Sequence, residues 1–126
     1  MKKLCSILTV IMLLALCSCI KKPTADVTVD KTTATVGETI TATSASTNAN
    51  TYLWGVFDGD NVSGGNSSNY TTISGGSPCD ATWSFSISVA GTYTLRLKVC
   101  NFKNGCDGEE DSSGYCDDVL VTLTIQ

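Results

Sequence analysis

The chain of 126 residues contains no histidine and is short of positive charge. Histidine is the commonest general base and metal ligand, so its absence argues against triad-type catalysis and histidine metal sites. Eight basic residues face 12 acidic ones, and a chain of this charge does not follow phosphate backbones, so we expect no nucleic-acid partner. No Gly-rich loop opens a helix to hold phosphate, and paired carboxylates occur only in loop sequences. We therefore expect a protein that is not an enzyme.

The only long apolar run lies near the N-terminus, over residues 4–16, after Lys2 and Lys3. It is too short to cross a bilayer core of about 30 Å as a helix, and it suits a signal peptide. The residues that follow, Leu-Cys-Ser-Cys at 16–19, resemble a bacterial lipobox. The resemblance implies a signal peptide over residues 1–18 and attachment of acyl chains such as palmitate to Cys19. Cys17 fits less well, because Leu16 would then occupy the position reserved for a small residue.

Cleavage before Cys19 would leave residues 19–126, with six basic and 12 acidic residues and a net charge of −6. Ile20 follows the cysteine instead of the aspartate that retains many lipoproteins at the inner membrane, which favours an outer-membrane address in the cell envelope. The sequence leaves open which side of that membrane the domain occupies. We expect residues 19–25 to be the lipidated cysteine and a short tether.

Residues 26–126 alternate between apolar and polar side chains with the period of a β-strand. Apolar residues occupy every second position in the segments 27–29, 40–42, 52–56, 83–89, 93–99 and 119–125, and Ser44 continues the alternation after Ala42. Polar turn sequences separate these segments, and an edge strand is expected near residues 70–73 within a long loop over 61–80. Ser, Thr, Gly and Asn are abundant, which favours strands and turns over helices. This pattern predicts an all-β, antiparallel, immunoglobulin-like sandwich of about seven strands.

Two segments of this domain resemble PKD (polycystic kidney disease) domains. Residues 54–59, Trp-Gly-Val-Phe-Asp-Gly, resemble the Trp-Asp-Phe-Gly-Asp-Gly signature, and residues 89–99 resemble the Pro-Gly-Thr-Tyr-Thr segment and its strand. The positions that match best are Trp54, Asp58, Gly59, Gly91 and Tyr93, whereas Gly55, Val56 and Phe57 depart from the signature. The resemblance covers residues 26–126 and implies an immunoglobulin-like spacer, or a protein or glycan contact module, without catalysis.

Trp54 and Tyr93 also have expected roles on physical grounds. A tryptophan on the third strand is the usual core anchor of such sandwiches. Tyr93 follows the turn that enters the next-to-last strand, where a tyrosine corner would hydrogen-bond back across the turn.

Four cysteines follow Cys19, and an even number in an exported domain predicts disulfides. Cys100 ends one strand and Cys116 begins its hairpin partner on the same outward face. We therefore favour Cys100–Cys116, which leaves Cys79–Cys106. The pairing of Cys79 with Cys100 and Cys106 with Cys116 remains an alternative. A zinc site is disfavoured because the spacings contain no Cys-x-x-Cys element.

The two outer faces of the sandwich are expected to differ. One should carry a ladder of hydroxyl side chains, namely Thr39, Thr41, Thr43, Ser84, Ser86 and Ser88. The other mixes charged and apolar groups and is our candidate partner-binding face, formed by Leu53, Arg96, Lys98, Asp118 and Leu120. The alternative is an ordinary surface in which Asp118 pairs with one of the two cations.

Other candidate sites lie in loops. Calcium prefers several carboxylate oxygens, and the weak candidates are Asp107, Glu109, Glu110 and Asp111, followed by Asp117 and Asp118, with Asp58 and Asp60 at another turn. None matches an EF-hand, and solvated loop charge is the simpler interpretation, so we expect no cofactor. Tyr70, Phe102 and Tyr115 could stack on sugar rings or cover the ends of the core.

These observations predict a lipid-anchored, non-catalytic envelope protein. Its PKD-like domain would act as an adhesion, scaffolding or ligand-binding module with a protein or glycan partner. The alternative is a periplasmic inhibitor or accessory subunit of a larger envelope complex, which would dock through its loops.

Overall fold

A computed structural model describes residues 20–59, 73–106 and 114–126. The expected signal peptide, Cys19 and the loop candidates Tyr70, Asp60 and residues 107–111 lie outside these residues. The described part contains β-strands and no helix, so no helix there is long and apolar enough to cross a membrane. Its strands are β1 (Val27–Val29), β2 (Thr33–Ala34), β3 (Thr39–Ser44), β4 (Thr51–Asp58), β5 (Ile73–Gly75), β6 (Thr82–Ser86), β7 (Gly91–Asn101) and β8 (Tyr115–Ile125).

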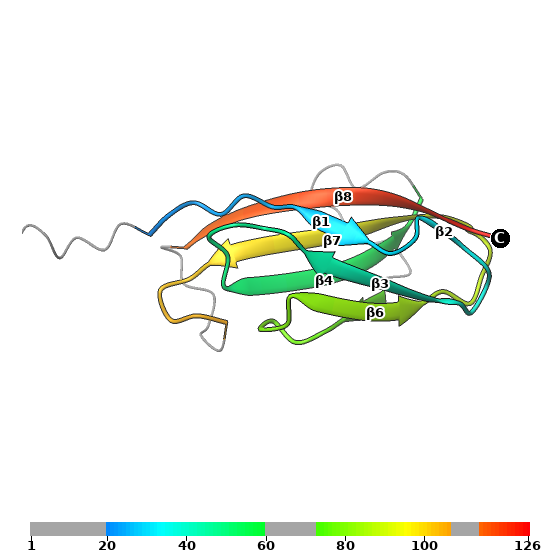
Figure 1. Ribbon diagram of the computed structural model, residues 1–126, viewed down its shortest axis with the longest axis horizontal. Coiled ribbons are helices and arrows are strands. Elements are labelled where there is room, and N and C mark those ends of the chain that lie inside the picture. The colour runs from blue at the N-terminus through cyan, green and yellow to red at the C-terminus, as the bar shows by residue number, and fades with distance from the viewer. Residues whose placement is uncertain (1–19, 60–72, 107–113) are drawn as a thin grey trace, which may run out of the picture.

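The strands form two sheets that pack face to face as a sandwich (Figure 1). One sheet has three strands in the order β1-β3-β6, and the other has five in the order β2-β8-β7-β4-β5. The predicted all-β sandwich is therefore confirmed. Figure 1 shows β1, β3 and β6 lying over the longer strands of the second sheet, with all long strands running between the same two poles.

The alternating side chains explain why the sheets pack as they do. In β7 the residues Leu95, Leu97 and Val99 are completely buried, and Leu123 and Ile125 of β8 are buried beside them. The facing sheet contributes Ile40, Ala42, Trp83 and Phe85. A shift of register by one residue would expose every one of these side chains, so the apolar pattern specifies the pairing.

The aromatic part of the core needs glycine next to it. The Trp83 ring stacks on Phe85 with centroids 4.5 Å apart and lies 6.3 Å from the Trp54 ring. A Cβ atom on Gly75 of β5 would come within 2.8 Å of Trp83 Nε1. A side chain at this position would therefore displace the indole, so glycine here lets the edge strand approach the tryptophan pair.

Not every strand pair is antiparallel as predicted. After β1 the chain crosses to the other sheet, where β2 pairs with β8 in parallel. The crossing is held by the Thr124 amide, which donates to Thr32 O at 2.8 Å, and by the Gln126 amide, which donates to Ala34 O at 2.9 Å. A strand of two residues has no periodicity to detect, so the sequence did not indicate this element.

The edge strand expected near residues 70–73 overlaps β5 (Ile73–Gly75) at Ile73, and residues 70–72 lie outside the described residues. One further expectation is corrected. Val89 was expected to continue the buried set of Trp83, Phe85 and Ile87, but it is 63% exposed. The reason is that β6 ends at Ser86, so Val89 and Ser88 belong to the turn that leads into β7.

Replacement of Leu97 by alanine tests the contribution of the core. The side chain is completely buried, so we expect Leu97→Ala to lower the free energy of unfolding by about 2–5 kcal/mol. Leu120→Ala is the matched control, because Leu120 is 46% exposed and should change stability by about 0.5 kcal/mol or less. Urea denaturation with the disulfides intact measures both, and equal losses would contradict this assignment of the core.

Candidate functional site

The five residues of the candidate partner-binding face come together on the outer face of the five-stranded sheet. Leu53 of β4 lies opposite Lys98 of β7, which in turn lies opposite Asp118 of β8. Arg96 lies opposite Leu120, one step further along the same face. Leu53 and Leu120 are both exposed large hydrophobic side chains, so charged and apolar groups alternate across this surface.

One ion pair organises the charged part of the partner-binding face. Arg96 Nε lies 3.2 Å from Asp118 Oδ2, although Lys98 is the residue directly opposite Asp118 in the ladder. Arg96 Nε is buried and makes no well-directed hydrogen bond, so its contact with Asp118 is mainly electrostatic. The two side chains as a whole are 36% and 47% exposed, and pairs this exposed contribute about 0–1 kcal/mol, so this pair positions the arginine more than it stabilises the fold.

Phe57 is a member of this surface that the sequence analysis did not include. A Cβ atom on Gly55 would meet two atoms of the Phe57 ring at 3.2 and 3.3 Å, so the ring lies over the glycine. Gly55 lies opposite Arg96 in the ladder. The Phe57 ring therefore lies beside β7, the strand that carries Arg96 and Lys98. The available signal was the glycine itself, because a glycine inside a strand often marks the close approach of another group.

The outer face of the three-stranded sheet is different in character. Its strands expose hydroxyl side chains that bond to one another: Thr41 Oγ1 and Ser84 Oγ are 3.0 Å apart, and Thr82 Oγ1 donates to Thr43 Oγ1 at 3.4 Å. No large hydrophobic side chain is exposed on β1, β3 or β6. The expected difference between the two faces is therefore present in the described strands.

Both cysteine pairs favoured from the sequence occur in the structure. Cys100–Cys116 joins directly opposed residues of β7 and β8 with a Cα–Cα distance of 4.1 Å, and Cys79–Cys106 links two loops at the same pole. Each bond closes a short loop and stabilises the fold by about 2–4 kcal/mol. Disulfides persist in oxidising compartments, so the two bonds indicate an extracytoplasmic location.

Residues 21–25, which were expected to form a tether, pack against the domain. Asn101 Nδ2 donates to Lys21 O at 2.9 Å, and Thr24 exchanges two backbone hydrogen bonds of 3.1 Å with Thr47. Pro23 between them is fully buried. The Ala25 amide donates to Asp117 Oδ2 at 2.9 Å, and this bond lowers the pKa of the Asp117 carboxyl. We call these five residues the docked segment.

The residues that matched the PKD motif occupy structural positions. Trp54 is buried and its Nε1 donates to Asp80 O at 3.1 Å. The Tyr93 hydroxyl donates to Val89 O at 3.0 Å, which is the bond expected of a tyrosine corner. Asp58 ends β4, and Gly59 after it has a φ of +87°, a conformation that favours glycine. Gly91 begins β7.

The loop candidates are placed as follows. Among residues 20–59, 73–106 and 114–126, no group of three or more acidic or cysteine side chains is arranged to hold a metal ion. Asp117 instead accepts a hydrogen bond from the Ala25 amide, and Asp118 forms an ion pair with Arg96. Phe102 is buried and packs against Gly114, so it covers the end of the core, whereas Tyr115 remains exposed.

A scan of the chain against protein-family models found no match, and neither did a search of curated proteins.

Acid should weaken the docked segment through Asp117. The bond from the Ala25 amide favours the carboxylate, so the pKa in the folded protein lies below the ordinary value of 3.8. Its contribution is therefore complete above pH 3.8 and is lost as the pH falls through the lower folded value. We expect Asp117→Ala, which removes the acceptor oxygen, to reduce the hydrogen-exchange protection of the Ala25 amide at neutral pH. Asp118→Ala, which leaves this bond intact, is the control, and unchanged protection in Asp117→Ala would contradict the role of the carboxylate.

Proposed function

We propose that the protein is a lipid-anchored, non-catalytic component of the bacterial cell envelope whose sandwich binds a protein or glycan partner. The observation that carries the binding role is the asymmetry of the two outer faces. Among the described strands, Leu53 and Leu120 are large hydrophobic side chains exposed on a sheet face, and both belong to the partner-binding face. A surface that mixes exposed apolar groups with an ion pair has the composition of a transient interface.

The PKD-like assignment is supported by the positions of the motif residues. Trp54 anchors the core and Tyr93 closes the turn before β7, as an immunoglobulin-like contact module requires. The absence of histidine and the use of the acidic residues Asp117 and Asp118 in structural bonds favour binding over catalysis. The domain would then serve adhesion, scaffolding or ligand capture at the outer membrane.

A second candidate function is favoured by the turns at the pole far from the docked segment. Val36 and Val89 are 47% and 63% exposed there, and the Gly37 amide joins their two turns by donating to Ile87 O at 2.8 Å. An apolar pair on loops suits a periplasmic inhibitor or accessory subunit that docks by its tip.

A photo-crosslinking amino acid placed at one position at a time distinguishes these roles in living cells. We expect a discrete crosslinked product from Leu120 and none from Ser86, an exposed control on the three-stranded sheet. Products from Val89 with none from Leu120 would replace the first role by the second. Equal products from Leu120 and Ser86 would contradict a specific binding face.

Lipid anchoring is tested by substitution of the two neighbouring cysteines. Cys19→Ala should abolish acylation and release the protein from the membrane fraction, because the thiol is the acyl acceptor. Cys17→Ala should remain acylated and membrane-bound. Mass spectrometry of the N-terminal peptide and detergent partitioning measure the two outcomes. Acylation that survives Cys19→Ala would rule out Cys19 as the lipidated residue.

A further inference from the structure

We propose that the pole of the sandwich where β8 begins faces the membrane and lies against the lipid headgroups, so that the domain stands upright on its anchor. This pole contacts the surface of the membrane in which the protein is anchored. The inference rests on lipidation at Cys19, as set out under the proposed function.

The first step is that the docked segment, which follows the anchor, is fixed to the sandwich. Four residues of the docked segment are fixed: Lys21 by Asn101, Pro23 by burial, Thr24 by Thr47 and Ala25 by Asp117. Asn101 is the last residue of β7, and Asp117 lies near the start of β8. The segment therefore joins the sandwich at one pole and cannot swing independently of it.

The second step is the length of chain between the anchor and the first contact. Ile20 alone separates Cys19 from Lys21. Because an extended chain spans at most about 3.6 Å per residue, two residues reach about 7 Å. The headgroup region of one leaflet is about 5–8 Å thick. The Lys21 carbonyl and the pole that binds it therefore lie at headgroup level when the acyl chains are inserted.

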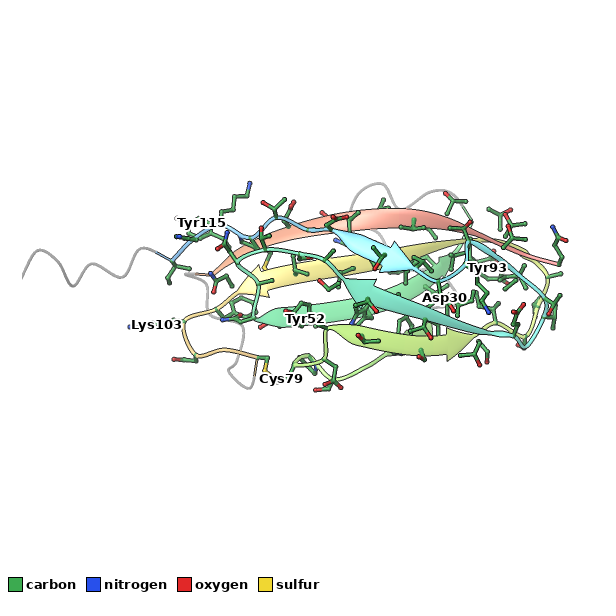
Figure 2. The ribbon with its side chains drawn as sticks, in the orientation of Figure 1. Asp30, Tyr52, Cys79, Tyr93, Lys103 and Tyr115 are labelled. Atoms are coloured by element: carbon green, nitrogen blue, oxygen red, sulfur yellow. A yellow bond between two sulfur atoms is a disulfide. The ribbon has the colours of Figure 1, made fainter. Side chains whose placement is uncertain are left out.

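The third step is the chemistry of the exposed side chains at this pole. Figure 2 shows Lys103 and Tyr115 at the end of the sandwich where the N-terminal segment enters. Lys21 and Lys22 are exposed in the same segment, and Tyr115 is 52% exposed. Lysine side chains reach phosphate groups, and tyrosine rings favour the membrane interface. Asp107, Glu109, Glu110 and Asp111 lie outside the described residues. The proposed orientation rests on the short chain between Cys19 and Lys21.

An upright domain has a defined consequence for binding. β7 and β8 each have 11 residues, and at about 3.3 Å per residue they span about 36 Å. The tip with Val36 and Val89 then stands about this far from the headgroups. The partner-binding face runs along the strands between the poles, so it is open to partners that approach from the side.

The test uses the full acylated protein in vesicles of phosphatidylethanolamine and phosphatidylglycerol that carry a spin label on the headgroup. A fluorescent noncanonical amino acid is placed at Lys103 or, as the matched control at the opposite pole, at Val89. Both sites are exposed. We expect quenching several-fold stronger at Lys103 than at Val89. A long Gly/Ser spacer inserted after Ile20 should lower the quenching at Lys103 towards that at Val89, because a flexible linker lets the pole leave the surface.

The outcomes separate the orientation from the anchor. If the acylated peptide is detected and Lys103 and Val89 are quenched equally, the domain does not stand on this pole and the orientation is overturned. If quenching at Lys103 survives the spacer unchanged, the tether does not set the orientation, and the proposal is equally overturned. If no acyl group is found on Cys19, the anchor fails and the orientation fails with it.

Discussion

β7 is paired with β8 along 11 positions and with β4 along eight, so it is the central strand of the larger sheet. Its inward side chains Leu95, Leu97 and Val99 are completely buried against the three-stranded sheet. Because side chains alternate along a strand, burial of this set also determines which residues face outward. The register of one strand therefore decides both where the core lies and what the partner-binding face presents.

The same register aligns the two ends of the sandwich. At one end Cys100 lies directly opposite Cys116, which brings the two cysteines close enough for a disulfide. At the other end Gly91 lies opposite Ile125, and the Tyr93 hydroxyl bonds to Val89 O across the turn. In Figure 2, Tyr93 marks this second pole and Tyr115 marks the first. A shift of the β7–β8 register would separate Cys100 from Cys116 and would also expose the buried side chains of both strands. The disulfide and the apolar core therefore specify the same register.

Much of this could be predicted from period-two alternation, and the failures have physical causes. The strands around Leu97 and Leu123 were found because their apolar residues fall on one parity. β2 was missed because two residues carry no period, and Val89 was misplaced because an apolar residue just beyond a strand end keeps the parity of the strand. The ring of Phe57 over Gly55 depends on a side-chain direction that the sequence does not encode. The docked segment was missed because its bonds use backbone groups and single side chains from distant positions.

The docked segment contacts the domain beside the disulfide that joins β7 to β8. Asn101 directly follows Cys100, and Asp117 directly follows Cys116, so two of the residues that hold the segment lie next to the disulfide between β7 and β8. A small domain has a modest core and gains much of its stability from such cross-links. If Cys19 carries the anchor as proposed, any force between membrane and domain enters the sheet at the point where two strands are covalently joined. The load then passes along β7 and β8, which carry the core on one face and the partner-binding face on the other. Anchoring, folding and recognition thus converge on one strand pair.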